Sequence, residues 1–429
     1  MLEAYTPQSN FPYLIGVYLA TNALPDAYLY VDGPDCAFYK AQFIHGKHDQ
    51  NSTLIDGEGN HRIRMSDVTV NRIVVDRTAL LKEAVVAMAE EKNCSVIMLT
   101  SMPMATITGT QYDLLVRDLR PGLDKLLLEV PALSLSGDWL DGYGETLAAL
   151  AQSIPCPGQP DPGKVAMVGY LMDRNERDHT ANVRELERMV RGIGLEPVSI
   201  WLSGRPLEHL SRVGEAGTII SLPHGRKAAR ILAQRTGARL LETGLPFGLK
   251  PTIDWLAQVA AGHNREAEAG AFIESELSQA IPSIQWLLHR YLVETNILFI
   301  GDPLLFEPAV EFLSELGCRV AGLVAVGRKA HLAPLPEALT NRSIPTLFEA
   351  NPHDIEALVA TLRGDRGIDL VIQSDTYGWP GEGNHAIVPF GLACNWWHAI
   401  WDTPYLGFHG ALSFVDRMAN ALMTRHRRK

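Results

Sequence analysis

The stretches "KVAMVGY" (residues 164–170) and "ELERMVRGIGLEPVSIW" (residues 185–201) decide the fold. The first is a short apolar run. The second places Leu186, Met189 and Val190 on one helical face, then passes through glycines into a new apolar run at Pro197. A strand, an amphipathic helix and a second strand in this order are typical of a βαβ unit with parallel strands. A glycine after the helix suits a left-handed C-cap.

The same order occurs twice more along the chain. "NILFIGD" (296–302) and "AVEFLSELGCRVAGLV" (309–324) repeat it closely, and an N-terminal copy is predicted with a strand at Val68–Val75, a helix at Leu80–Glu91 and a strand at Ser95–Leu99. We therefore predict an α/β protein with three doubly wound, Rossmann-like domains and mainly parallel sheets.

Domain boundaries are predicted from composition and helical periodicity. The Pro/Gly-rich stretch "PCPGQPDPGK" (155–164) has no periodicity and is interpreted as a linker. A long helical stretch, Phe272–Leu292, is expected to cross the second boundary. The predicted domains are residues 1–155, 156–280 and 281–429.

Composition narrows the class of partners. The chain has 429 residues, 46% of them apolar, and a net charge of -11, which disfavours nucleic acid as a partner. We expect no membrane span, because no apolar run approaches the ~20 residues that a span needs. The N-terminus has no basic segment before an apolar run, so no signal peptide is expected. The five cysteines form no CxxC pair, which favours a reducing cytoplasm over a disulfide framework.

The stretch "YVDGPDCAF" (30–38) contains the principal candidate site. A predicted strand, Ala27–Val31, ends in Asp-Gly-Pro-Asp and is followed by Cys36 and a predicted helix at Ala37–Ile44. In doubly wound domains ligands bind beyond the carboxyl ends of the strands. A helix N-terminus also lowers the pKa of a thiol and favours metal ligation. A cysteine packed as a small apolar residue is the alternative, and spacing alone leaves both open.

Two further regions contain polar or aromatic candidates. Thr100–Gly109 follows another predicted strand and is expected near Cys36, although its hydroxyls could simply cap a helix. "NHAIVPFGLACNWWHAIW" (384–401) includes His385, Cys394 and His398. Its three tryptophans could form a wall for a planar ligand or pack as ordinary apolar side chains. The chain contains neither GxxxxGK[ST] nor GxGxxG, so ATP or dinucleotide binding of the usual kind is not expected.

These features together resemble the nitrogenase component 1 superfamily over nearly the whole chain. Gly33-Pro-Asp-Cys36 is similar to that family's cluster-ligand turn, and Thr100–Gly109 to its second ligand loop. "GLPFGLKPTIDWL" (244–256) and Gly407-Phe-His-Gly410 are similar to two further family segments. The resemblance implies an oxidoreductase subunit with an iron–sulfur cofactor, in which Gly33, Asp35 and Cys36 belong to the cofactor site.

The chain departs from the family's three-cysteine pattern. The first ligand position falls in "SNFP" (9–12) and the third in "SMPM" (101–104), and neither contains a cysteine. The resemblance then implies a three-plus-one arrangement. In this arrangement Cys36 would be the single metal ligand from this chain, and a homologous component 1-type partner subunit would supply three cysteines to a shared [4Fe–4S] cluster. Asp35 is a reserve ligand, because one family member uses an aspartate in this role.

The resemblance implies two functions that the sequence does not separate. One is a nitrogenase-like reductase subunit, in a heterotetramer or a homodimer. It would receive electrons from an ATP-dependent, nitrogenase reductase-like iron protein and reduce a bound substrate, for which a tetrapyrrole is a candidate. His385 and His398 are then candidate catalytic proton donors. The other is a scaffold subunit that holds a larger iron–sulfur cofactor during assembly. A metal- or ligand-binding protein of periplasmic type, with a similar multi-domain build, is a third hypothesis, and the expected absence of a signal peptide and the linker layout weigh against it.

Overall fold

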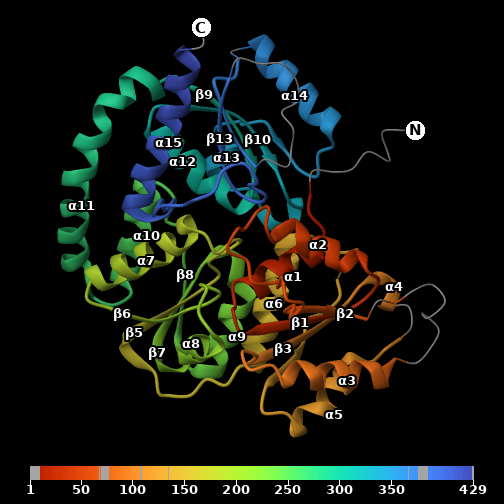
Figure 1. Cartoon of the computed structure of the whole chain (residues 1–429). Coiled ribbons are helices and arrows are strands. Elements are labelled where there is room, and N and C mark those ends of the chain that lie inside the picture. The colour runs from red at the N-terminus through yellow and green to blue at the C-terminus, as the bar shows by residue number, and fades with distance from the viewer. Residues whose placement is uncertain are drawn as a thin grey trace. The chain divides into compact units, whose positions relative to one another are not determined.

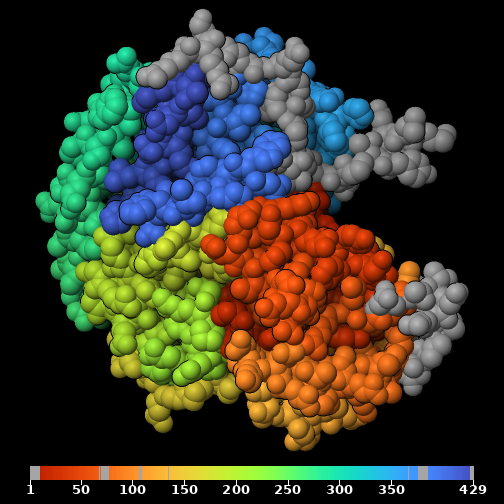
Figure 2. All heavy atoms as spheres, viewed as in Figure 1, coloured from red at the N-terminus to blue at the C-terminus, as the bar shows by residue number. Residues whose placement is uncertain are grey.

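The computed structural model describes residues 10–66, 68, 77–106, 109–133, 135–365, 367–374 and 385–427, which are the coloured parts of Figures 1 and 2. The strands of these described residues form three sheets. Every pairing between the described strands is parallel. The predicted α/β class with parallel sheets is therefore confirmed.

The first sheet has the strand order β2-β1-β3-β4 (red to orange in Figure 1). Its central strands β1 and β3 are buried at every residue, as expected for a parallel sheet with covered faces. Side chains of β1 and β3 pack with α3 and α5 in one apolar cluster. The strands are β2 (Ile63–Met65), β1 (Ala27–Asp32), β3 (Val96–Ser101) and β4 (Leu126–Glu129), and the helices are α1 (Tyr13–Asn22), α2 (Cys36–Ile44), α3 (Thr78–Ala89), α4 (Pro103–Thr106), α5 (Tyr112–Leu119) and α6 (Trp139–Ser153).

The strand order of this sheet reverses between β1 and β3. The chain leaves β1 toward β2 on one side, and later adds β3 and then β4 on the other side. Ligands of doubly wound sheets bind at the carboxyl ends of the strands, at this switch point. Asp32 pairs with Ser101 at the last position of the two strands, so the loops after β1 and β3 begin side by side.

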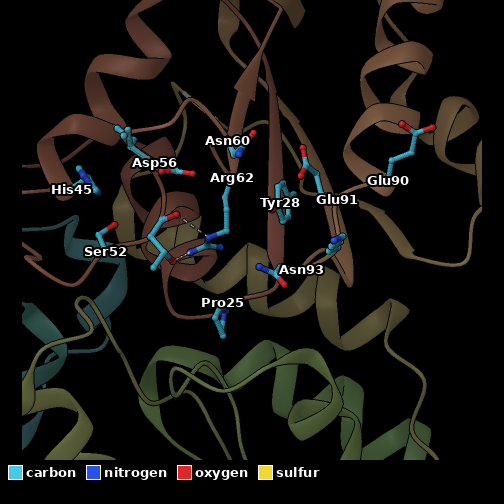
Figure 3. Close-up of a pocket in the computed structure, with 14 residues that line it drawn as sticks. Pro25, Tyr28, His45, Ser52, Asp56, Asn60, Arg62, Glu90, Glu91 and Asn93 are labelled. Carbon is cyan, nitrogen blue, oxygen red and sulfur yellow. Dashed lines mark hydrogen bonds between the residues drawn. The ribbon is translucent and has the colours of Figure 1, made fainter.

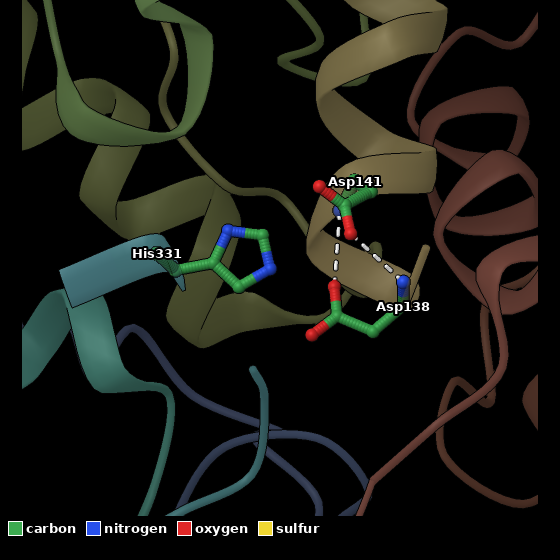
Figure 4. A group of neighbouring side chains, drawn as sticks. All are labelled: Asp138, Asp141 and His331. Atoms are coloured by element: carbon green, nitrogen blue, oxygen red, sulfur yellow. Dashed lines mark hydrogen bonds between the residues drawn. The ribbon is translucent and has the colours of Figure 1, made fainter. Parts of the chain in front are cut away.

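Helices α1 and α6 approach each other at glycines. A Cβ added to Gly16 would lie 1.7 Å from the carbonyl oxygen of Trp139, and one added to Gly142 would lie 2.0 Å from that of Tyr13. Helix α6 begins with a capping box that Figure 4 shows: the Asp138 carboxylate accepts from the Asp141 amide, and the Asp141 carboxylate accepts from the Asp138 amide.

The second and third sheets repeat this arrangement, with the orders β6-β5-β7-β8 and β11-β10-β9-β12-β13. The predicted left-handed glycines are present: Gly194 and Gly317 have φ angles of 78° and 77°. The second sheet contains β5 (Asp161–Val168), β6 (Glu196–Ile200), β7 (Ala216–Ser221) and β8 (Arg239–Glu242), with helices α7 (Arg177–Gly192), α8 (Leu207–Ser211) and α9 (Arg226–Thr236) along the same part of the chain.

The third sheet is the C-terminal one (teal to blue in Figure 1). Its strands are β9 (Asn296–Gly301), β10 (Arg319–Ala325), β11 (Thr346–Leu347), β12 (Leu370–Gln373) and β13 (Ala386–Pro389). The helices of this part are α10 (Leu249–Ala261), α11 (Glu266–Leu287), α12 (Phe306–Glu315), α13 (Glu337–Thr340), α14 (Pro352–Asp365) and α15 (Gly407–Arg427).

The chain forms two compact units. One contains residues 12–176 and 196–242, and therefore the first two sheets. The other contains residues 1–11, 177–195 and 243–429, and therefore the third sheet together with α7. Each sheet draws its strands from one predicted domain range, while the boundaries at residues 155 and 280 remain predictions.

Some local predictions need correction. The predicted linker at 155–164 is shorter, because β5 already begins at Asp161. The predicted strand Val68–Val75 lies, apart from its first residue, outside the described residues. None of the described helices combines the length and the apolar character that crossing a bilayer requires.

Candidate functional site

Cys36 lies at the switch point of the first sheet, where it is the first residue of α2. Its thiol is free and half-buried. Lys40 lies one helical turn further along, with its Nζ atom 3.9 Å from the Cys36 sulfur. The strand–turn–helix arrangement predicted around this cysteine is therefore present. The thiol is neither fully packed nor fully exposed, a position from which a ligand can be reached.

In the turn before Cys36, Gly33 packs against the loop that follows β3. A Cβ added to Gly33 would lie 2.7 Å from the Met102 side chain, and the Met102 amide donates to the Asp32 carbonyl at 2.9 Å. The loop predicted to approach the Cys36 turn therefore does so. Asp35 occupies the N-cap position of α2 and is exposed, and its side chain makes no capping hydrogen bond.

The residue after Cys36 is fixed from α1. The hydroxyl of buried Tyr18 donates to the Ala37 carbonyl at 2.9 Å. Burial raises the pKa of Tyr18 strongly, so the phenol keeps its proton and remains a donor. The backbone on the helix side of Cys36 is thereby held in place.

Asp32 is a buried carboxylate that the sequence reading passed over as a strand end. It is 0% exposed and accepts hydrogen bonds from Ser66 (2.6 Å), Arg77 (2.9 Å) and Tyr112 (2.5 Å). A buried charge needs such partners, because desolvation is otherwise costly. The one signal in the sequence is an acidic residue directly after an apolar strand. Its partners are 34, 45 and 80 positions away, so spacing could not reveal them.

The other four cysteines are buried or half-buried within the fold. Burial raises the pKa of the Cys94 and Cys318 thiols to about 12. The buried Cys394 donates to the Trp397 carbonyl at 3.4 Å. Cys156 is half-buried, contacts the Ile154 carbonyl at 3.6 Å, and has a pKa raised by burial. Thiols with a raised pKa are poor thiolate ligands, so Cys94, Cys156 and Cys318 are unsuited to bind a metal.

The two candidate proton donors, His385 and His398, flank β13. His385 directly precedes the strand, at its amino end, and is half-buried. Burial, together with Arg363 and Arg425, lowers the pKa of His385 to about 4. Its imidazole is therefore neutral at pH 7, an unfavourable state for a proton donor. The half-buried His398 has its Nε2 atom 3.2 Å from the Asn395 carbonyl oxygen.

The three tryptophans of residues 396–401 do not share one environment. Trp396 and Trp401 are 80% and 77% exposed, whereas Trp397 is half-buried and has the Arg417 guanidinium 3.9 Å from its ring centroid. That contact covers one face of Trp397 with a cation. Two of the three side chains are thus largely exposed.

A pocket lined mainly by polar residues (Figure 3) lies at the amino ends of the strands of the first sheet, whereas Cys36 follows a carboxyl end. Its volume is about 760 Å³, and residues that precede β1, β2 and β3, such as Pro25, Arg62 and Asn93, line it. Arg62 is buried and donates to the carbonyls of Thr21, Leu24 and Ala27, so it closes the end of α1. The pocket is at the amino ends of the strands, where ligands of this fold class are not expected.

The parallel sheets and the length of the chain agree with a match to one known protein family. A model described as nitrogenase component 1 type oxidoreductase matches residues 13–423. The chain belongs to this family. The family and the oxidoreductase class implied by the sequence resemblance are thereby confirmed.

Individual relatives are distant. The nitrogenase vanadium-iron protein beta chain of Trichormus variabilis is 23% identical over 70% of this chain and 69% of its own. The light-independent protochlorophyllide reductase subunit N of Heliobacterium modesticaldum is 28% identical over 36% of this chain and 33% of its own. A different subunit of that reductase, from Rubrivivax gelatinosus, is 22% identical over 77% of this chain and 63% of its own. The aligned parts thus span from a third to about two thirds of these relatives.

The fold has a close counterpart among solved structures. Nitrogenase Cp1 at pH 6.5 superposes with a TM-score of 0.82 at 16% identity, and the match covers 100% of this chain and 98% of the other. At this identity the likeness concerns the fold. The whole described fold of this chain therefore resembles that of a solved nitrogenase protein.

Proposed function

We propose that this chain is the single-ligand subunit of a nitrogenase-like reductase. Cys36 would ligate a [4Fe–4S] cluster at the interface with a homologous partner subunit, and an ATP-dependent iron protein would supply electrons through that cluster. The observation that carries the proposal is the position of Cys36. It is a free, half-buried thiol at a helix start, at the switch point of the first sheet, in a chain of this family.

The donor set of this chain fits one corner of such a cluster. A cubane needs four ligands, usually thiolates. Three of the other cysteines are buried: Cys94, Cys318 and Cys394. The fourth, Cys156, follows α6 and lies beside Gly214. Because Gly214 precedes β7, Cys156 is at the amino ends of the strands of the second sheet. Of the five cysteines, only Cys36 is a half-buried thiol at the first residue of a helix directly after a strand, so three ligands must come from elsewhere. The exposed Asp35 is the reserve ligand.

The relatives favour a reductase and suggest a class of substrate. Two of them are subunits of light-independent protochlorophyllide reductase, whose substrate is a tetrapyrrole. A planar macrocycle of this kind could stack on exposed aromatic rings, and Trp396 and Trp401 provide such rings. The bound cluster would supply one-electron reduction. The lowered pKa of His385 disfavours this residue as proton donor, which leaves His398 as the other candidate.

The second candidate is a scaffold subunit for assembly of a larger iron–sulfur cofactor. The single half-buried thiol fits this function equally well, because a scaffold also needs a shared cluster at a subunit interface. The two functions differ in turnover: a reductase passes electrons to a free substrate, and a scaffold retains its cofactor without consuming one.

Electron delivery tests the proposal. The chain is co-expressed with a three-cysteine partner, purified anaerobically, and mixed with the iron protein, MgATP and a tetrapyrrole. A reductase shows ATP-dependent reduction of the interfacial cluster by EPR, followed by a change in the tetrapyrrole absorbance. A stable cluster of more than four irons with no loss of tetrapyrrole indicates the scaffold. A complex without iron contradicts both functions.

A further inference from the structure

We propose that Asp32 is the positioning residue for Cys36: its buried carboxylate sets the turn that presents the thiol. The inference rests on the proposed function for the role of that thiol, whereas the positioning itself can be tested without a cluster. Asp32 does not contact the ligand site. It acts through the backbone of Gly33, the next residue in the chain.

The Asp32 carboxylate connects two strands of the first sheet with two of the neighbouring helices. Asp32 ends β1, and its Oδ1 atom accepts from Ser66, which follows β2. Its Oδ2 atom accepts from Arg77, which precedes α3, and from Tyr112, the first residue of α5. Arg77 is 5% exposed, so the ion pair is screened little by solvent. Each oxygen therefore has strong donors from a different direction, and the carboxylate is fixed.

Ser66 links the Asp32 carboxylate to the turn by hydrogen bonds. Its hydroxyl donates to Asp32 and also accepts from the Gly33 amide at 2.9 Å. On the other side, the Asp32 carbonyl accepts from the Met102 amide, and the Met102 side chain covers Gly33. Gly33 is thus held between two loops. Pro34 follows with a restricted φ angle, so little freedom remains before Cys36.

The helix side of Cys36 is held independently of Asp32. The Ala37 amide donates to the Pro34 carbonyl at 3.1 Å, and the Ala37 carbonyl accepts from Tyr18. A change at Asp32 or Ser66 should therefore alter the turn while α2 stays attached. This separation lets the positioning role be distinguished from a general loss of structure.

Thiol reactivity provides the test in the isolated chain. Cys36 and Cys156 are both free and half-buried in the same compact unit, so Cys156 serves as the internal reference. Native chain is treated with iodoacetamide, and the Cys36/Cys156 alkylation ratio is followed by mass spectrometry. Ser66→Ala is expected to change the ratio about fivefold, the size associated with one lost buried hydrogen bond. Asp32→Asn is expected to change it more, and Tyr112→Phe in the same direction.

The matched control is Ser203→Ala. Ser203 is a buried serine of the same unit whose hydroxyl donates to the Ile200 carbonyl at 2.7 Å, far along the chain from the turn. Its removal should leave the ratio unchanged. If Asp32→Asn does not fold, Ser66→Ala and Tyr112→Phe decide, since each keeps the Asp32–Arg77 pair. An unchanged ratio in both folded variants overturns the positioning role.

A spectroscopic measurement in the complex separates this inference from the proposed function. With full iron content, the Ser66→Ala complex is expected to show shifted g-values of the reduced cluster relative to wild type and to Ser203→Ala. Identical g-values with full iron would count against positioning. A wild-type complex that holds no iron overturns the proposed function, and the alkylation ratio then decides the positioning role alone.

Discussion

At the scale of single residues, Gly33 has little room in the turn that presents Cys36. The Met102 side chain would lie 2.7 Å from an added Cβ. We predict that Gly33→Ala lowers the free energy of unfolding by about 1–3 kcal/mol, the usual cost of overpacking. Chemical denaturation measures the loss.

The second substitution Met102→Ala should restore part of this loss, because it removes the Cγ and Sδ atoms, 2.7 and 2.8 Å from the added Cβ, but keeps the Met102 Cβ at 2.9 Å. Gly57→Ala is the control, since nothing lies within 4 Å of a Cβ at that position. A Gly33→Ala protein as stable as wild type would show that the turn is looser than described.

His409 and Glu185 give the chain a pH-dependent contact. Their Nδ1 and Oε2 atoms are 3.0 Å apart. The hydrogen bond to Glu185 raises the pKa of His409, so its stabilisation is complete below its ordinary value of 6.5 and is lost as the pH rises through the raised pKa. Burial raises the pKa of Glu185, but hydrogen bonds from Arg188 and His409 outweigh it and lower the pKa to about 2. Its contribution is present above 4.5 and is lost as the pH falls toward 2.

We predict that His409→Gln removes a stabilisation of about 0.5 kcal/mol at pH 6, a small value because the His409 side chain is 55% exposed. The difference from wild type should shrink as the pH rises through the raised pKa. Denaturation curves at pH 6 and above measure it, with His289→Gln, an exposed histidine of the same unit, as control. A constant difference across this range would contradict the linkage.

Residue-scale prediction from the sequence had a clear limit. Cys36 could be found because a thiol after a strand and before a helix is a local pattern. The Asp32 carboxylate could not be given partners, because Arg77 and Tyr112 reach it only through the fold. For the same reason, the contact between the Gly407-Phe-His-Gly410 segment and Glu185 was beyond sequence reasoning.

At the scale of elements, Arg188 and its partner Glu185 together link three helices. From α7 it makes paired hydrogen bonds to Glu185 on its own helix and to Glu276 on α11, while Glu185 also contacts His409 on α15. We predict that Arg188→Ala lowers the free energy of unfolding by about 3 kcal/mol, because the buried Glu185 carboxylate loses its main partner. Denaturation midpoints measure the loss.

Arg188→Lys should recover only part of this stability, since an ammonium group cannot form both paired contacts. Lys250→Ala is the control: its pair with Asp254 in the same unit is exposed and is expected to contribute less than about 1 kcal/mol. An equal loss in the Arg188→Ala and Lys250→Ala proteins would contradict the proposed junction.

Elements with a clear period were predictable from the sequence. The predicted helix at Leu80–Glu91 is present as α3, Thr78–Ala89, because its apolar residues face one side. Helix α1 was missed: all ten of its residues are buried, so it shows no amphipathic period. The position of β2 was also missed, since Ile63–Met65 is too short to give a pattern.

At the scale of the whole molecule, the repeated βαβ pattern was sufficient to predict parallel sheets. It could not give the strand order, which depends on how distant segments pair. That order places Cys36 at a switch point, a stronger indication of a ligand site than its flanking residues alone.

The most direct test of the account is the cluster content of the anaerobically purified complex with Cys36 replaced by alanine. We predict that Cys36→Ala loses most of the iron and the [4Fe–4S] EPR signal, because one of four ligands is removed, while Cys156→Ala keeps both. If Asp35 substitutes as the ligand, Cys36→Ala retains an altered signal that Asp35→Ala/Cys36→Ala abolishes. A Cys36→Ala complex with full iron and an unaltered wild-type spectrum would contradict the central claim.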